Sequence, residues 1–214
     1  MRLARPVVLL ACLTTCIFGC GGEGSPVGPG SSAVIQGVFT NEYFGLTLPI
    51  PDGWFVASEE SEKAIRDAGT AAVVGDDATL KAAVEASKKT TFQLLTLSEF
   101  EMGAAVEFNP SLTLMAERVS HVPGIKSGKD FLFHAAKMLL QTQLPYKLMK
   151  EAYPTKLGDQ EWYRADFVFD QALMSIEQSY FAAKHRDYVL VVILSAATKE
   201  QMVVLERIAD SIKL

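Results

Sequence analysis

Cysteine is confined to the first twenty residues of this 214-residue chain. Cys12, Cys16 and Cys20 are its only cysteines, so everything after Cys20 has no thiol and forms no disulfide. Cysteine-based catalysis and thiolate metal sites are therefore excluded from that part of the chain. Its stability must come from an apolar core alone.

Histidine is also scarce, and recognisable catalytic motifs are absent. His121, His134 and His185 are too far apart in sequence for the short ligand spacings of common zinc motifs. The sequence has no Gly-x-Ser-x-Gly elbow, no Walker loop and no His-Glu-x-x-His motif. Each histidine is interpreted as a loop, turn or boundary residue.

Carboxylates are the remaining candidates for chemistry. Glu99, Glu101 and Glu107 suggest paired acids, but a solvated acidic loop accounts for them more simply. Asp76 and Asp77 suggest a calcium contact, but no EF-hand pattern surrounds them, and a helix cap explains both. We therefore predict a protein that is not an enzyme and binds no metal or cofactor.

The only long apolar run lies at the start of the chain. Arg2 and Arg5 precede an apolar segment over 7–19, which is the layout of a secretory signal peptide. The run is shorter than the roughly 20 residues that span a bilayer. It ends in Ile17-Phe18-Gly19-Cys20. A long apolar residue, two smaller ones and a cysteine form a bacterial lipobox, which predicts lipid attachment at Cys20 and cleavage after Gly19.

Two alternatives to this lipobox remain open. Phe18 is bulkier than the usual residue, and Cys16 follows a rival pattern that ends in Thr15. An ordinary signal peptide cut near Gly19 or Gly22 would leave Cys20 incidental. Gly19 suits the residue before the cut better than Thr15, so we favour Cys20. Several acyl chains such as palmitate would give stable membrane anchoring without a membrane span.

The charge balance is acidic. The chain carries a net charge of −5, and removal of the segment with Arg2 and Arg5 leaves −7. A net negative surface argues against nucleic acid or anionic lipid as a partner. The expected partners are the membrane, through the lipid anchor, and a protein that the sequence does not name. Gly21, in place of an Asp after Cys20, favours the outer membrane over the inner one.

Composition divides the chain into three parts. Residues 1–19 are predicted as the signal peptide, 20–33 as the lipidated N-terminus with a Gly/Ser/Pro-rich flexible tether, and 34–214 as a single α+β domain. Within the domain, periodicity predicts an antiparallel sheet with helices packed on it. The predicted helices are 59–68, 78–88, 127–144 and one that begins after Thr198. Ser58 and Ser127 are the predicted N-caps of the first and third, and Thr198 and Gln201 form a predicted capping box at the last. The predicted strands are 37–41, 43–49, 54–56, 91–97, 112–119, 147–152, 160–170, 175–184 and 188–194. The turn 50–54, with Pro51, Asp52 and Gly53, is predicted to join the second and third strands as a hairpin.

Some elements also show which face they bury. Phe131, Ala135, Met138, Leu139 and Thr142 recur at helical spacing, and so do Met202, Leu205, Ile208, Ala209 and Ile212. The run 188–194 is apolar throughout, which predicts a central strand covered on both faces. Strand 160–170 alternates, with Tyr163, Ala165, Phe167 and Phe169 directed to the core. Trp162 and Arg164 fall on the opposite face, so Trp162 is expected to be exposed, and the two residues form a candidate partner surface.

The start of the domain resembles PsbP-like domains. The residues that carry the resemblance are Phe39-Thr40-Asn41-Glu42-Tyr43-Phe44-Gly45-Leu46, then Leu48-Pro49 and Asp52-Gly53-Trp54, with Ser211-Ile212 at the end of the chain. The resemblance covers roughly 37–214 and implies an α/β/α sandwich around an antiparallel sheet. Members of that fold act as protein-binding or assembly modules, and no catalytic set is common to them.

These observations lead to one functional hypothesis with two alternatives. We expect a lipid-anchored, non-enzymatic protein-binding or assembly module of the cell envelope. A carrier of a small hydrophobic ligand would instead require an apolar cavity between sheet and helices. A hydrolase with dispersed catalytic residues would require a deep pocket with convergent polar groups.

Overall fold

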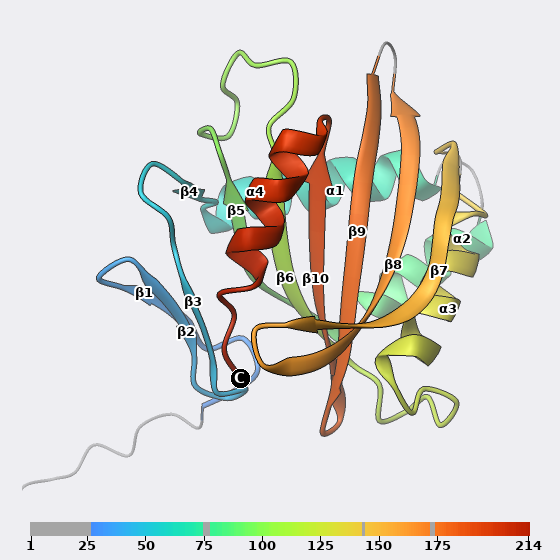
Figure 1. Ribbon diagram of the computed structural model, residues 1–214. Coiled ribbons are helices and arrows are strands. Elements are labelled where there is room, and N and C mark those ends of the chain that lie inside the picture. The colour runs from blue at the N-terminus through green and yellow to red at the C-terminus, as the bar shows by residue number, and fades with distance from the viewer. Residues whose placement is uncertain (1–26, 75–77, 143, 172–173) are drawn as a thin grey trace, which may run out of the picture.

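The computed structural model describes residues 27–74, 78–142, 144–171 and 174–214 (Figure 1). Ile17, Gly19 and Cys20 of the predicted lipobox lie outside this range, as do Asp76 and Asp77. Within it, no helix combines the length and the apolar character that crossing a bilayer requires.

A seven-stranded antiparallel sheet forms the centre of the described residues, with the strand order β4-β5-β6-β10-β9-β8-β7. Its strands are β4 (Phe55–Val56), β5 (Thr91–Ser98), β6 (Ser111–Arg118), β7 (Tyr146–Leu157), β8 (Gln160–Gln171), β9 (Met174–His185) and β10 (Tyr188–Ala196). The apolar run of β10 lies in the middle of the sheet, as its composition predicts.

A second, three-stranded sheet lies beside the main one in Figure 1. It consists of β1 (Ser32–Ile35), β2 (Val38–Asn41) and β3 (Leu46–Pro49). β1 begins at Ser32, whereas the sequence placed the start of the domain at Val34. An isolated bridge between Thr47 and Lys213 ties β3 to the end of the chain.

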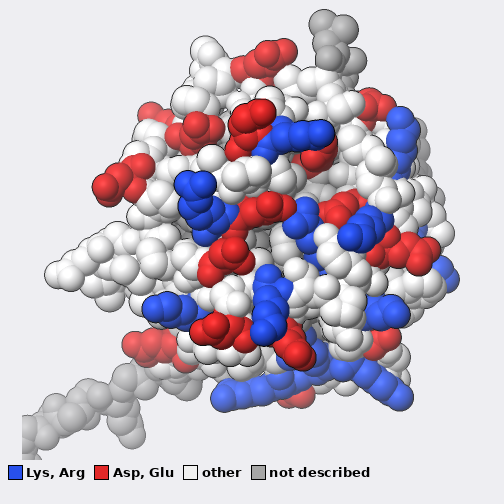
Figure 2. Space-filling view, in the orientation of Figure 1, with Lys and Arg blue, Asp and Glu red and all other residues white. Residues whose placement is uncertain are grey.

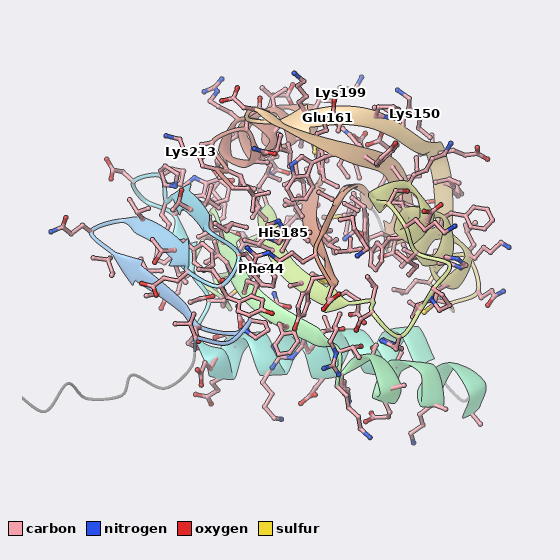
Figure 3. The ribbon with its side chains drawn as sticks, turned by 90° about the horizontal axis from the view of Figure 1, so that it is seen from below. Phe44, Lys150, Glu161, His185, Lys199 and Lys213 are labelled. Carbon is pink, nitrogen blue, oxygen red and sulfur yellow. The ribbon has the colours of Figure 1, made fainter. Side chains whose placement is uncertain are left out.

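Helices cover both faces of the main sheet. Helix α4 (Lys199–Ala209) packs on one face, beside the small sheet. Helices α1 (Glu59–Val74), α2 (Ala78–Ser87) and α3 (Gly128–Leu139) lie on the other face (Figures 1 and 3). This arrangement confirms the predicted α+β class, an antiparallel sheet flanked by helices.

Two apolar cores share strand β10. Leu190, Val192 and Leu194 belong to the core beneath α4, which also contains Leu205. Val189 and Val191 belong to the core beneath α3, with Leu132. Because successive side chains of a strand point to opposite faces, β10 contributes to both cores.

Local capping signals determine where three helices begin. Ser61 N donates to the Ser58 hydroxyl at the start of α1. Ser127 caps α3, and its hydroxyl accepts from Asp130 N. Thr198 and Gln201 form a complete capping box at α4. All three caps follow the sequence prediction.

Four elements differ from their predictions. The predicted hairpin across the turn 50–54 is not formed, because β4 pairs with β5. α1 continues to Val74, and β7 continues to Leu157 through two register irregularities. α3 ends at Leu139, and Met138 on it is exposed, because Leu132 and Ala136 form the centre of its buried face.

Candidate functional site

The predicted partner surface lies on β8, beneath and beside α4. Alternation along β8 places Tyr163, Ala165 and Phe167 on the α3 face, as predicted. Trp162 and Arg164 therefore point to the α4 face. The prediction that Trp162 is exposed is wrong, because only 1% of it is accessible. It belongs to the core beneath α4.

The physical reason for this error is a second covering layer. The pattern of β8 shows which residues share a face, but not that α4 covers the face opposite α3. The turn between β7 and β8 also closes against the end of the chain. A Cβ on Gly158 would lie 2.7 Å from the Ile212 carbonyl oxygen, so the two backbones are in direct contact.

Arg164 is the centre of a half-buried polar network, the Arg164 network. Its Nε donates to Asp166 Oδ1 at 2.6 Å, and its Nη1 donates to Glu206 Oε1 of α4 at 2.6 Å. Its Nη2 donates to the Ser179 hydroxyl of β9 at 2.8 Å. The guanidinium also lies 5.1 Å from the centre of the Phe181 ring. Arg164 thereby connects β8, β9 and α4.

The remaining members of the network bind Asp166. Ser179 Oγ donates to Asp166 Oδ1 at 2.9 Å, and Tyr153 Oη donates to Oδ2 at 3.1 Å. Burial raises the pKa of Tyr153 to about 12, so the phenol stays protonated and remains a donor. Burial lowers the pKa of Arg164, but its bonds to Asp166 and Glu206 outweigh this, and the net shift is upward.

A hollow of about 320 Å³ adjoins the Arg164 network, lined among others by Met149, Val168 and Glu177. All three guanidinium nitrogens of Arg164 and both carboxylate oxygens of Asp166 already form hydrogen bonds within the protein. The arrangement is therefore suited to hold α4 against the sheet, through the bond between Arg164 and Glu206.

A larger hollow of about 950 Å³ lies between α1, α2 and β5. The described residues that line it are mostly charged; among them are Glu62, Lys63, Arg66 and Lys88. Burial raises the pKa of Glu62, with hydrogen bonding to Thr96 as the largest opposing effect. A charged lining does not fit the apolar cavity that a carrier of hydrophobic ligands requires.

The end of the sheet at β4 and the loop after β5 carries a group of exposed apolar side chains, the apolar patch. It consists of Phe55, Val56, Phe100, Met102 and Val106, which are between 37% and 43% accessible. Phe55 pairs with Ser98, whose hydroxyl lies 3.8 Å from Met102 Sδ. Asn109 braces the loop, since it accepts from Phe100 N and donates to Phe100 O. These bonds hold the two ends of the loop together.

Only acidic charges occur in the two segments that form this end. Segments 50–62 and 96–111 contain seven Asp or Glu and no Lys or Arg. They are joined by the β4–β5 pairing and by the bond from Ala57 N to Thr96 O. In Figure 2, Asp and Glu outnumber Lys and Arg at the upper left of the molecule. The apolar patch thus has an acidic surround.

The predicted acidic loop is confirmed, because Glu99, Glu101 and Glu107 are exposed. The sequence analysis did not identify the exposed apolar residues of the same loop. The available signal was Phe100, Met102 and Val106 in a segment with neither helical nor strand periodicity. Apolar residues without periodicity have no core face to join.

The histidines do not form a site. His121 and His134 are exposed, and His185 is half-buried near the ring of Phe44, at 6.0 Å between centroids. Figure 3 shows His185 and Phe44 close together. Within the described ranges, no three His, Cys, Asp or Glu side chains come together as ligands for a metal ion.

Comparison with known proteins finds similarity only among solved structures. No protein-family model matches the sequence, and no curated protein matches it. The chain is similar to LpqN, which is involved in cell envelope biogenesis of Mycobacterium tuberculosis, at 15% identity over 88% of this chain and 83% of that chain, with a TM-score of 0.42. It is also similar to the cyanobacterial PsbP (CyanoP) of Synechocystis sp. PCC 6803, at 14% identity over 92% of this chain and 99% of that chain, with a TM-score of 0.45.

A PsbP structure is among the solved structures to which the chain is similar. The similarity concerns the general course of the chain. It identifies no partner, ligand or site residue in this protein.

Proposed function

We propose that this chain is a lipid-anchored, non-enzymatic module of the cell envelope that binds a protein partner. Residues 1–19 serve as signal peptide, and Cys20 carries the lipid. Residues 20–33 connect it to the single domain 34–214, on the outer membrane where the organism has one. The support for the anchor is the position of Ile17, Gly19 and Cys20 at the end of an apolar run.

The observation that carries the proposed binding function is the apolar patch. Exposed apolar side chains that cluster within a polar surround are typical of protein interaction sites. The patch has no Lys or Arg in its own segments, so its surround attracts positive charge. The partner that fits is a protein segment with apolar and basic side chains.

The other long exposed feature, edge strand β7, is less suited to partner binding. A free sheet edge offers unpaired backbone groups that a partner strand could use. β7 has two register irregularities, and it contains Pro154 and the exposed lysines Lys147, Lys150 and Lys156. These features protect an edge against strand addition.

Site-specific photo-crosslinking in native envelopes tests the binding site. A photoreactive residue at Met102 should give a discrete protein adduct, and one at Met149, an exposed methionine on β7, should not. The Met102 adduct should disappear in the variant Glu101→Lys/Glu107→Lys, because charge of the wrong sign then surrounds the patch. Equal adducts from both positions, or an adduct that is indifferent to charge reversal, would contradict the proposal.

The anchor requires a separate experiment. Cys20→Ser should abolish incorporation of labelled palmitate and leave the precursor uncut, whereas Cys16→Ser should leave both unchanged. Normal labelling of the Cys20→Ser variant would show that the lipid site has been misassigned.

A further inference from the structure

The end of the sheet opposite the apolar patch carries a group of exposed cationic side chains, the basic end. Its members are Lys89, Arg118, Lys126, Lys129, Lys184 and Arg186. None of the six forms an ion pair with a carboxylate of the described residues. In Figure 2, Lys and Arg side chains extend along the lower border of the molecule.

Strand pairing brings the first of these residues together. Arg118, the last residue of β6, pairs with Tyr188 at the start of β10, directly after the turn that contains Arg186. Arg118 N also donates to Thr90 O, next to Lys89. Three strands therefore place basic residues at the same end of the sheet.

Helix α3 adds two lysines to this end. A Cβ on Gly128 would lie 2.0 Å from the Ala182 carbonyl oxygen, so the start of α3 lies directly against β9. Lys126 and Lys129 flank this contact. Lys184 follows on β9, two residues beyond Ala182.

The acids at this end neutralise only part of the charge. Glu117 accepts hydrogen bonds from Thr90 and Thr91, and Asp130 is bound to the cap residue Ser127. Glu42 and Asp187 are exposed. The basic end thus carries six cationic and four acidic side chains, and two of the acids are held in hydrogen bonds. The whole chain, by contrast, is acidic.

The first described residues of the chain lie at this same end. Gly30 approaches Phe92, near the start of β5, with 3.8 Å between a Cβ built on it and Phe92 Cδ1. Asn41 Nδ2 donates to Pro29 O at 2.9 Å, and Phe44 N donates to Asn41 Oδ1. Phe44 in turn lies beside His185. Residues 29–32 are therefore fixed next to the basic end.

We propose that the basic end rests on an anionic lipid surface. Lysine and arginine side chains are attracted to anionic headgroups within about one Debye length, roughly 8 Å at physiological ionic strength. The chain enters the domain at this end, and only eight residues lie between Cys20 and Pro29, so a lipid-anchored N-terminus, on which this step rests, would keep the basic residues closer to the membrane than the acidic end. The acidic end, 50–62 and 96–111, would then point away from the lipid, because its carboxylates and the anionic headgroups repel each other.

Vesicle co-sedimentation tests this contact without the lipid anchor. The probe is the mature chain from residue 20 with Cys20→Ser, which keeps every described strand and helix. It is mixed with phosphatidylcholine vesicles that contain or lack phosphatidylglycerol, at low and at high salt. Binding should require phosphatidylglycerol and should fall with added salt.

Two charge-matched variants locate the contact. Arg118→Glu/Lys126→Glu/Lys129→Glu should weaken binding at least about tenfold, since each residue next to the surface contributes. Lys147→Glu/Lys150→Glu/Lys199→Glu changes the net charge equally but lies elsewhere; Figure 3 shows Lys150 and Lys199 on the α4 side, away from His185. This control should retain most of the binding.

Each other outcome overturns the proposal. Absence of binding at low salt, equal binding to neutral vesicles, or equal loss in the two variants would each exclude an electrostatic contact at the basic end. A Gln version of the first variant should give a smaller loss, and it replaces the Glu version if that variant melts early. Failure here leaves the crosslinking at Met102 and the labelling of Cys20 unaffected, so the proposals are tested independently.

Discussion

At the scale of single residues, Arg164 joins three elements of the α4 face through one side chain. Its guanidinium is bound by Asp166, Ser179 and Glu206, and 20% of the side chain is exposed. An ion pair at this depth lies between an exposed pair, worth up to about 1 kcal/mol, and a fully buried one, whose disruption costs about 3–5 kcal/mol. The network should therefore contribute measurably to stability.

Removal of Arg164 should cost more than removal of Glu206. Arg164→Ala leaves Asp166 half-buried without its cation, and we expect a loss of about 2–3 kcal/mol in the free energy of unfolding. Glu206→Ala leaves the Arg164–Asp166 pair intact and should cost about 1 kcal/mol. Glu161→Ala, an exposed acid on the same strand, should stay within about 0.5 kcal/mol of the wild type.

Urea unfolding of a protein that comprises residues 20–214 measures this order. If Glu206→Ala matched the Glu161→Ala control, the ion pair between β8 and α4 would contribute nothing to stability.

His185 gives the protein a defined response to pH. Burial lowers the pKa of its imidazole, and the neighbouring positive charge of Arg186 lowers it further. A histidine with a lowered folded-state pKa binds fewer protons in the folded state than in the unfolded state. Stability should therefore be complete above the unfolded pKa of about 6.5 and should decrease as the pH falls below it.

Thermal unfolding between neutral and mildly acidic pH tests this effect. His185→Gln should reduce the decrease in melting temperature on acidification, whereas His121→Gln, at an exposed position, should leave it unchanged. An undiminished decrease in His185→Gln would assign the pH response to other groups.

At the scale of elements, the contact between α3 and β9 depends on one glycine. Gly128 lies so close to β9 that an added Cβ would meet the Ala182 carbonyl carbon at 2.6 Å and its oxygen at 2.0 Å. Both are backbone atoms, so relief requires the helix or the strand to move. This contact determines how closely α3 can cover the sheet.

Gly128→Ala should consequently destabilise the protein, although alanine favours helices. We expect a loss of about 1–3 kcal/mol from overpacking, measured as a shift of the urea midpoint. Gly124→Ala is the matched control, because a Cβ there meets nothing within 4 Å. A neutral Gly128→Ala would mean that α3 shifts without cost.

The elements also show what the sequence could predict. Local signals sufficed where a residue acts on its own segment: Ser127 and Thr198 cap their helices, and the apolar run of β10 is central. The sequence was not sufficient where a segment far away in the chain determines whether a residue is buried or which strand it pairs with. Trp162 is buried because α4, more than thirty residues later, covers its face, and Phe55 pairs with Ser98 across both α1 and α2.

The two candidate surfaces, the apolar patch with its acidic loop and the basic end, were likewise predictable only in part. The acids of the loop after β5 were visible in the sequence, and so was every lysine of the basic end. Their separation to opposite ends was not, because Lys89, Arg118, Lys129 and Arg186 come from four segments that only strand pairing and the packing of α3 bring together. A net charge of −7 for residues 20–214 concealed this separation.

At the scale of the whole molecule, the two cores should unfold together. They share β10, whose alternate residues Leu190 and Val191 lie in different cores. Loss of either core removes one side of the strand that supports the other. A small domain of this kind should show a single cooperative transition.

Truncations in each core test this cooperativity. Leu132→Ala beneath α3 and Leu205→Ala beneath α4 should each cost about 2–5 kcal/mol, because both side chains are fully buried. Trp54 and Trp162 both belong to or pack against the core beneath α4, so their fluorescence reports on that core alone. In Leu132→Ala, fluorescence and circular dichroism should still shift to the same midpoint. Separate midpoints would show that the cores are independent.

Strand β5 also sets a distance. Phe92 at its start lies beside Gly30, and Ser98 at its end lies beside Met102. The six steps from Phe92 to Ser98 span roughly 20 Å at about 3.3 Å per residue. Because β5 is paired with β6, this distance does not vary as a linker's would. If one end rests on lipid and the other holds a protein, the domain acts as a spacer that keeps its partner at a constant height above the membrane.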